Sequence, residues 1–302
     1  MRDLTPDAPV APTERTMSLT TTEKCDDAHV WKLYRRGNLL GQGNFGNVRA
    51  ATHRKTLRRY AVKSIKFVNF SPANQRRLRE EIGILQRIDH PNVVRLYEVY
   101  ESETWLYLVL ELCLGRTVVD AILDPDDPTR KMSERETLRC IHKLLLALRY
   151  CHELGIVHRD VKPENFVYEN GRSNSEPKLI DFGLSNAGTS SGGTSMQTFC
   201  GTLPYQAPEM FALATGSDAA YDSKVDMWAV GVTAYFLLCG QIPFCEDDKA
   251  TMGVAVTAGL AKGRLGFTHP AWKTITREVR YYLFNSLDRV TEYFIIFNTN
   301  NN

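Results

Sequence analysis

One short run limits what this chain can be more than any other. Residues 158–165 read His-Arg-Asp-Val-Lys-Pro-Glu-Asn, and Asp181-Phe182-Gly183 begins sixteen positions after Asn165. Asp160 offers a carboxylate that can accept a proton, and Lys162 places a cation near it. Asn165 and Asp181 carry the oxygen ligands that magnesium prefers. Phosphoryl transfer from ATP needs such a set, because the protein mainly positions the reactants and neutralises phosphate charge.

A glycine-rich run lies between two predicted strands, residues 38–40 and 47–51. It reads Gly41-Gln42-Gly43-Asn44-Phe45-Gly46-Asn47-Val48, and glycines let the backbone approach a triphosphate closely. A lone pattern of this kind is weak, since dinucleotide-binding folds also use it, but there it leads from a strand into a helix. Here a strand follows, so the run predicts a loop over the phosphates of a nucleotide.

A helix is predicted next, beginning at Ser71-Pro72, a capping side chain followed by a proline suited to the first turn. Leu78, Ile82 and Leu85 recur at helical spacing and form its apolar face. Glu81 stands one turn before Leu85 on that inward face, whereas Glu80 points to solvent. Glu81 can therefore pair with Lys63 of the preceding strand, residues 60–65. Taken alone, Lys63 would be read as a solvated charge; the glycine run before it and the carboxylate after it favour a role at the phosphates.

The remaining pattern divides the chain into a strand-rich part and a helical part. Strands at residues 94–100 and 105–110 complete a small antiparallel sheet. A capping box at residues 133–136 begins a helix that runs to about Cys151, and its predicted apolar side holds Leu138, Ile141, Leu145 and Leu148. A buried helix is predicted at residues 227–239, a segment too short to span a bilayer.

Bulk properties exclude several classes of protein. A net charge of +2 gives no electrostatic case for binding nucleic acid or a membrane. The seven cysteines are scattered without a CxxC pair, so we expect reduced thiols and no disulfide-linked partner. The predicted compartment is the cytoplasm, with the nucleus as the alternative.

The ordered motifs resemble the eukaryotic protein kinases of the serine/threonine type. The resemblance runs from about residue 34 to about residue 244, and more faintly to about residue 291. It includes residues 198–202, the Ala207-Pro208-Glu209 triplet, residues 226–232 and residues 240–244. Lys162 and Thr202 are typical of serine/threonine kinases. Glu111-Leu112-Cys113 and the Cys-Gly-Thr-Leu-Pro-Tyr run at residues 200–205 are similar to the calcium/calmodulin-dependent and AMP-activated-like group.

The resemblance implies an α+β, bilobal fold. Its N-lobe, residues 34–114, would hold a small antiparallel sheet with one main helix, and its C-lobe, residues 115–291, would be mainly helical and shortened. Residues 1–33 are expected to be a disordered leader, and residues 292–302 an atypical tail. Residues 286–291 faintly resemble a turn near the end of the family's domain, which normally supplies an arginine to Glu209. Arg289 is the candidate for that arginine, and the family's usual last helix is missing.

The resemblance also implies a role for each site residue. Asp160 would orient the substrate hydroxyl and accept its proton, Lys162 would neutralise the γ-phosphate, and Asn165 and Asp181 would hold Mg2+. Asp226 would accept backbone N–H bonds from the catalytic loop. His158 is expected to be structural, in an apolar column with Leu85, Leu96 and Phe182. The expected ATP-binding residues are Leu40, Gly41, Gln42, Gly43, Asn44, Phe45, Gly46, Asn47, Val48, Ala61, Lys63, Glu111 and Cys113.

Protein substrates and an upstream activating kinase are the expected partners. Thr198 is the predicted activation-loop phosphorylation site, with Arg159 as the cation that engages the phosphate. Thr202 and Glu164 would form the substrate platform, although Thr117 stands where relatives often carry a glutamate. A pseudokinase or scaffold is the alternative, motivated by the eroded C-terminus. A small-molecule kinase is disfavoured by the segment at residues 202–209.

Overall fold

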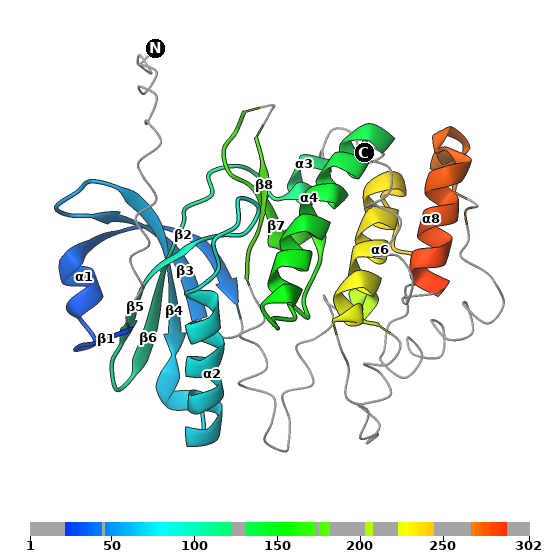
Figure 1. The fold of residues 1–302 in the computed structure, drawn as a ribbon. Helices are drawn as coiled ribbons and strands as arrows, with labels where there is room; N and C mark the ends of the chain where they lie inside the picture. Colours follow the sequence, from blue (N-terminus) through cyan, green and yellow to red (C-terminus); the bar gives the residue numbers. More distant parts are fainter. Residues whose placement is uncertain are drawn as a thin grey trace, which may run out of the picture.

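The computed structural model describes residues 22–43, 46–122, 131–172, 175–181, 203–207, 223–244, 267 and 269–288. Its strands are β1 Thr22–Lys24, β2 Tyr34–Gly43, β3 Gly46–His53, β4 Arg59–Lys66, β5 Leu96–Glu101, β6 Trp105–Leu110, β7 Phe166–Tyr168 and β8 Pro177–Leu179. Its α-helices are α1 His29–Leu33, α2 Pro72–Leu85, α3 Val118–Ile122, α4 Glu134–Glu153, α6 Lys224–Cys239 and α8 Arg277–Asp288 (Figure 1). Predictions for Asn44, Phe45, Phe182, Thr198, Thr202, Glu209 and Arg289 lie outside the described residues.

The sheet that carries the glycine run has six strands in the order β1-β5-β6-β4-β3-β2. All neighbouring pairs are antiparallel except β1 and β5, which run parallel, with Glu23 opposite Tyr100. The helices α4, α6 and α8 stand side by side at the other end of the molecule, beyond the β7–β8 pair (Figure 1). The predicted α+β architecture, a sheet-rich part followed by a helical part, is confirmed.

The segment before residue 34 differs from the expected disordered leader as far as the structure describes it. Residues 22–24 form β1 and residues 29–33 form α1. Val30 is fully buried, in a cluster with Tyr34, Val62 and Tyr107. A three-residue strand and a five-residue helix are too short to show a period in the sequence, and only their packing on the sheet defines them.

Helix α2 begins where its sequence predicts. The Ser71 side chain accepts a hydrogen bond from the backbone N–H of Asn74, and proline occupies the first turn. Leu78 and Ile82 are buried against the sheet, in a cluster that also holds Ile65, Phe67, Leu96, Val99, Leu106 and Leu108. Burial of this face stabilises α2 on the sheet, because a short helix gains most of its stability from packing.

Helix α4 has the predicted capping box between Ser133 and Glu136, but its predicted buried side is wrong in one respect. Leu138 is 44% exposed. The face that is buried holds Thr137, Cys140, Leu144, Ala147, Leu148 and Cys151. The run Leu144-Leu145-Leu146 is apolar on more than one side of the helix, so spacing alone did not identify the buried face.

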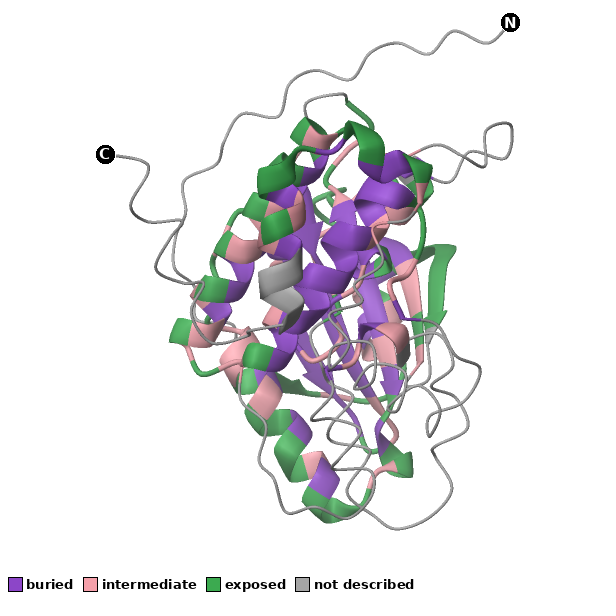
Figure 2. Ribbon diagram, turned by 90° about the vertical axis from the view of Figure 1, so that its right-hand side faces the viewer, coloured by how far each residue is buried: buried purple, intermediate pink, exposed green. Residues whose placement is uncertain are grey.

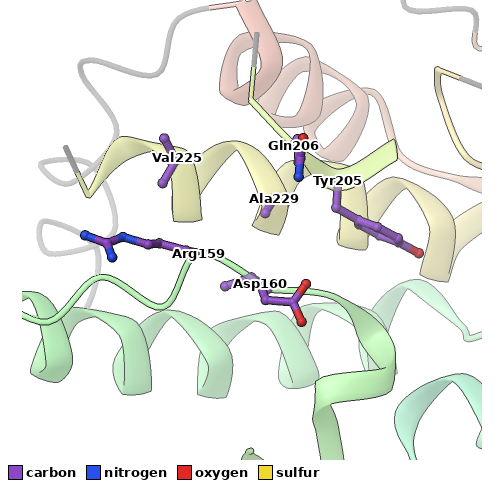
Figure 3. Close-up of a pocket in the computed structure, with 7 residues that line it drawn as sticks. Arg159, Asp160, Tyr205, Gln206, Val225 and Ala229 are labelled. Carbon is purple, nitrogen blue, oxygen red and sulfur yellow. The ribbon is translucent and has the colours of Figure 1, made fainter. Parts of the chain in front are cut away.

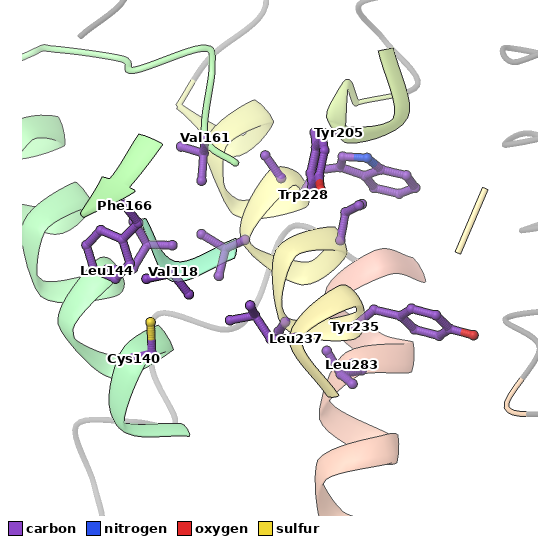
Figure 4. Packing of buried hydrophobic residues seen from close by; sticks show 14 of the residues in the cluster. Val118, Cys140, Leu144, Val161, Phe166, Tyr205, Trp228, Tyr235, Leu237 and Leu283 are labelled. Carbon is purple, nitrogen blue, oxygen red and sulfur yellow. The ribbon is translucent and has the colours of Figure 1, made fainter. Parts of the chain in front are cut away.

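Helix α6 is the buried centre of the helical part. It packs between α4 and α8 and places Trp228, Tyr235 and Leu237 in the core (Figure 4). Gly240 ends it with φ 74, a left-handed conformation that glycine adopts without steric cost. Buried residues gather where the helices face one another and the sheet (Figure 2). No helix among the described residues has the length and apolar character to cross a membrane.

The described C-terminal segment is a helix where the sequence predicted a turn. Ser286, Leu287 and Asp288 are the last residues of α8, so the turn expected at residues 286–291 is wrong in its first half. Val279 and Leu283 of α8 are buried in the core. Thr276, just before α8, donates from its N–H and its hydroxyl to the Glu134 carboxylate at 2.9 and 2.8 Å, which ties this end to α4.

Candidate active site

The loop that carries Asp160 is held by a buried carboxylate on α6. Asp226 is fully buried and accepts the backbone N–H of His158 at 2.8 Å and that of Arg159 at 2.7 Å. Its Oδ2 also lies 2.8 Å from Nε2 of His152. The role that the family resemblance implied for Asp226 is therefore present in the geometry. Three polar partners satisfy a charge that would otherwise be costly to bury.

Within that loop, Asp160 is fixed through one carboxylate oxygen only. Its Oδ2 accepts from Nζ of Lys162 at 2.8 Å and from Nδ2 of Asn165 at 2.9 Å. Its Oδ1 is buried and has no hydrogen-bond partner. An unsatisfied buried acceptor costs about 1–3 kcal/mol, so this oxygen keeps its full capacity to accept a hydrogen bond.

Two residues of the site have a backbone conformation that is rare outside glycine. Arg159 has φ 66 and Asp181 has φ 61. Such conformations cost about 1–3 kcal/mol each and persist where surrounding contacts impose them. For Arg159 the imposing contact is the hydrogen bond from its N–H to Asp226. Figure 3 shows the Arg159 and Asp160 side chains pointing apart beside a small pocket that Tyr205, Gln206, Val225 and Ala229 also line.

Lys63 of β4 forms an ion pair with Asp181, which follows β8. Burial alone would raise the pKa of Asp181, but the Lys63 ammonium holds it below its usual range. Asn165 uses its amide nitrogen for both of its bonds to Asp160, at 2.8 Å to the carbonyl and 2.9 Å to the carboxylate. Its oxygen remains for a cation. With the Asp181 carboxylate it gives oxygen ligands of the kind that Mg2+ prefers, so these residues fit the ion.

Glu81 does not form the predicted pair with Lys63 in this conformation. Glu80 is exposed and Glu81 half-buried, as the helical phase predicted, but Oε2 of Glu81 is buried without a hydrogen-bond partner. Burial raises the pKa of Glu81 to about 7, and the positive charges of Arg159 and Arg77 lower it by less. Here the Lys63 ammonium donates to Asp181.

The glycine run includes the end of β2 and the start of β3, and the backbone at Gly46 leaves no room for a side chain. Its φ is 148, and a Cβ there would lie 1.7 Å from the carbonyl oxygen of Ser64 on β4. Val48 lies opposite Lys63 in the β3–β4 register, and Ala61 lies opposite Leu110. Leu40 is 51% exposed. Gly41, Gln42 and Asn47 are exposed as well.

The segment after β6 is tied to β8 through a lysine that the sequence reasoning missed. Glu111 pairs through Oε1 with Nζ of Lys178 at 3.0 Å, and the same Nζ donates to the Pro91 carbonyl at 2.9 Å. The only signal in the sequence was a lysine between Pro177 and Leu179, three positions before Asp181; its burial and its partners depend on segments far away in the sequence. Cys113 is half-buried, and burial raises the pKa of its thiol to about 12, so the thiol is neutral.

Two further predicted residues lie at the edges of this constellation. His158 is fully buried, with Nε2 3.1 Å from the Ile180 carbonyl, which fits the structural role expected of it. Glu164 is exposed. Tyr205 is buried nearby, and burial together with the charge of Glu164 raises its pKa.

Residues 34–292 match the model of the protein kinase domain. Serine/threonine-protein kinase DCLK1 of Rattus norvegicus is 38% identical over 252 residues, which are 82% of this chain and 54% of that protein. Calcium-dependent protein kinase 5 of Plasmodium berghei (strain Anka) is 36% identical over 251 residues, 82% of this chain and 41% of that protein. Myosin light chain kinase A of Dictyostelium discoideum is 35% identical over 255 residues, 84% of this chain and 81% of that protein.

The chain belongs to the protein kinase domain family. The predicted family is thereby confirmed, and the names of these relatives agree with the group that the motifs indicated. The chain spans about half the length of the first of them and less than half of the second.

Proposed function

We propose that this chain transfers the γ-phosphoryl group of Mg-ATP to serine and threonine hydroxyls of protein substrates. The observation that carries the proposal is the state of Asp160. Lys162 and Asn165 hold Oδ2, while Oδ1 is buried and has no partner. A general base must lie within hydrogen-bond reach of the proton that it accepts, and Oδ1 is the atom free to do so.

The residues proposed for proton transfer all lie within the described part of the chain. The substrate hydroxyl donates to Oδ1 of Asp160, which orients the hydroxyl oxygen and takes its proton. As that oxygen bonds to the γ-phosphorus, the bond from the γ-phosphorus to the β,γ-bridging oxygen breaks and ADP leaves. Lys162, bound to the other oxygen of Asp160, lies where its ammonium can offset the charge of the transferring group. Asp226 keeps the loop still during this step through its bonds to His158 and Arg159.

Asn165 and Asp181 would hold Mg2+. The bound cation would offset the part of the phosphate charge that the protein side chains do not neutralise. We expect the ion pair between Lys63 and Asp181 to open when Asp181 binds the cation. Lys63 is then free to bind the α- and β-phosphates and to pair with Glu81, whose Oε2 lacks a partner.

A scaffold with a kinase fold is the second candidate, favoured by the missing Lys63–Glu81 pair. Incubation of the purified chain with labelled ATP, magnesium and a mixed peptide library, followed by phosphoamino-acid analysis, distinguishes the two. The enzyme gives phosphoserine and phosphothreonine, and Lys63→Met abolishes them. A scaffold gives no label above background.

The proposal also includes an activating phosphorylation site, a substrate platform and a cellular compartment. Thr198 is the proposed activating site, phosphorylated by an upstream kinase. Thr202 and Glu164 are proposed to form the substrate platform. The proposed compartment is the cytoplasm, with the nucleus as the alternative. A phosphate on Thr198 would add about −1.5 to −2 charge for Arg159 to engage. Mass spectrometry of active protein should find that phosphate, and full activity in Thr198→Ala would exclude the site.

A further inference from the structure

Glu101, at the end of β5, carries a buried carboxylate that is paired with cations from two segments distant in the sequence. Its side chain is only 4% exposed. Arg79 of α2 donates to it through Nε, at 3.1 Å to Oε2 and 3.3 Å to Oε1, and through Nη2 at 2.9 Å to Oε1. Lys24 of β1 forms a second ion pair with Oε1. Since a buried carboxylate is costly without partners, Arg79 and Lys24 together offset the cost of burying Glu101, and the carboxylate links their two segments.

The first of these segments is held to the sheet edge by several contacts besides Lys24. The backbone N–H of Cys25 donates to the Glu101 carbonyl at 2.9 Å. Ser102 donates to the Asp27 carboxylate, and the hydroxyl of Tyr107 donates to the Asp27 carbonyl at 3.0 Å. Residues 22–33 lie before the part of the chain that matches the family model, which begins at residue 34.

The second segment is the helix that carries Glu81. Arg79 and Glu81 are two residues apart, and at 3.6 residues per turn such residues lie on nearly opposite sides of a helix. Arg79 is therefore tied to the sheet edge while Glu81 lies on the side facing the site. The Arg79 guanidinium also lies 4.8 Å from the ring centre of Phe67, which is buried in the same cluster as Leu78. The rotation of α2 about its axis is thus limited by the bond from Arg79 to Glu101.

We propose that Glu101 is a positioning residue for phosphoryl transfer: it couples the N-terminal strand β1 to α2 and thereby holds Glu81 where Lys63 can reach it. The proposal rests on the function proposed above. Glu101 acts through Arg79 and touches no reacting group. Lys24, which is 71% exposed, contributes less than Arg79, which is 44% exposed, and its contribution falls as salt is raised.

The test combines hydrogen exchange and steady-state kinetics on the full chain. Glu101→Gln should speed amide exchange in α2 several-fold, leave α4 and α6 unchanged, and lower kcat several-fold. Lys24→Met should do the same more weakly, and only at low salt. Arg79→Lys keeps the charge but loses the two-pronged bond, so it should fall between wild type and Glu101→Gln. It also serves as the milder variant if Glu101→Gln does not fold.

Two control variants change the same kinds of charged side chain but leave the contacts of Glu101 intact. Glu103→Gln changes an exposed carboxylate two positions away. Lys32→Met breaks an exposed pair with Asp26, whose atoms are 3.1 Å apart. Both should leave the exchange of α2 and kcat at wild-type values.

The proposal is overturned if α2 in Glu101→Gln exchanges as in wild type, or if exchange rises equally in α4 and α6. Faster exchange of α2 with an unchanged or increased kcat would also overturn the positioning role. If wild type transfers no phosphate, the proposed function fails, whereas the exchange comparison still decides the coupling of β1 to α2.

Discussion

The ammonium of Lys63 lies against the carboxylate of Asp181, 118 residues further along the chain, and not against Glu81. Under the proposed function this pair would open when Mg-ATP binds, because Lys63 would bind the phosphates and Asp181 the cation. Binding to the folded state alone raises the free energy of unfolding by about 2.7 kcal/mol at a ligand concentration of a hundred times Kd.

We therefore expect Mg-ATP to raise the melting temperature of wild type. Asp181→Asn should abolish the magnesium dependence of that rise, and Lys63→Met should reduce the rise caused by ATP. Differential scanning fluorimetry with ATP in the presence of magnesium or of a chelator measures both effects. An equal rise in all three proteins would show that the nucleotide binds elsewhere.

Glu81 gives the protein a pH dependence of known sign. Burial raises its pKa in the folded state to about 7 from an ordinary value of 4.5. Between these pH values the folded protein keeps a proton that the unfolded chain has lost, so this group makes the free energy of unfolding fall as pH rises. Glu81→Gln should remove that part of the slope in urea titrations from pH 4.5 to 7, whereas Glu80→Gln, at an exposed site, should leave it. Identical slopes in all three proteins would refute the assigned burial.

Gly46 and Gly41 belong to the same glycine run but differ in their surroundings. A Cβ at Gly46 would lie 1.7 Å from the Ser64 carbonyl oxygen, whereas a Cβ at Gly41 meets nothing within 4 Å. Gly46→Ala should lower the free energy of unfolding by about 1–3 kcal/mol, and Gly41→Ala should change it by less than about 1 kcal/mol. Chemical denaturation measures the difference. Equal losses would contradict the described register of β3 and β4.

Much of the fold follows from local sequence signals, and the exceptions have physical reasons. Ser71 and Ser133 cap α2 and α4 as predicted, since a cap depends only on neighbouring residues. The burial of Val30 and Lys178 could not be predicted, because it depends on strands far away in the sequence. The same holds for the choice of Lys63 between Asp181 and Glu81, which depends on how two distant segments meet.

The corrected face of α4 gives a matched pair of leucines. Leu148 is 1% exposed and Leu138 is 44% exposed. Leu148→Ala should lower the free energy of unfolding by about 2–5 kcal/mol, since it leaves a cavity in the core. Leu138→Ala should change it by no more than about 0.5 kcal/mol. Urea denaturation measures both losses of unfolding free energy. A larger loss for Leu138→Ala than for Leu148→Ala would show that Leu138 is buried, as the sequence spacing predicted.

The central claim is that Oδ1 of Asp160 accepts the proton of a serine or threonine hydroxyl. The most direct measurement compares the rate of label transfer from Mg-ATP by wild type and by Asp160→Asn, with equal melting temperatures as the check on folding. Loss of the base should lower the rate by about 10²–10⁴-fold, and the wild-type product should be phosphoserine or phosphothreonine. Wild-type turnover in Asp160→Asn, or phosphotyrosine as the main product, would contradict the account.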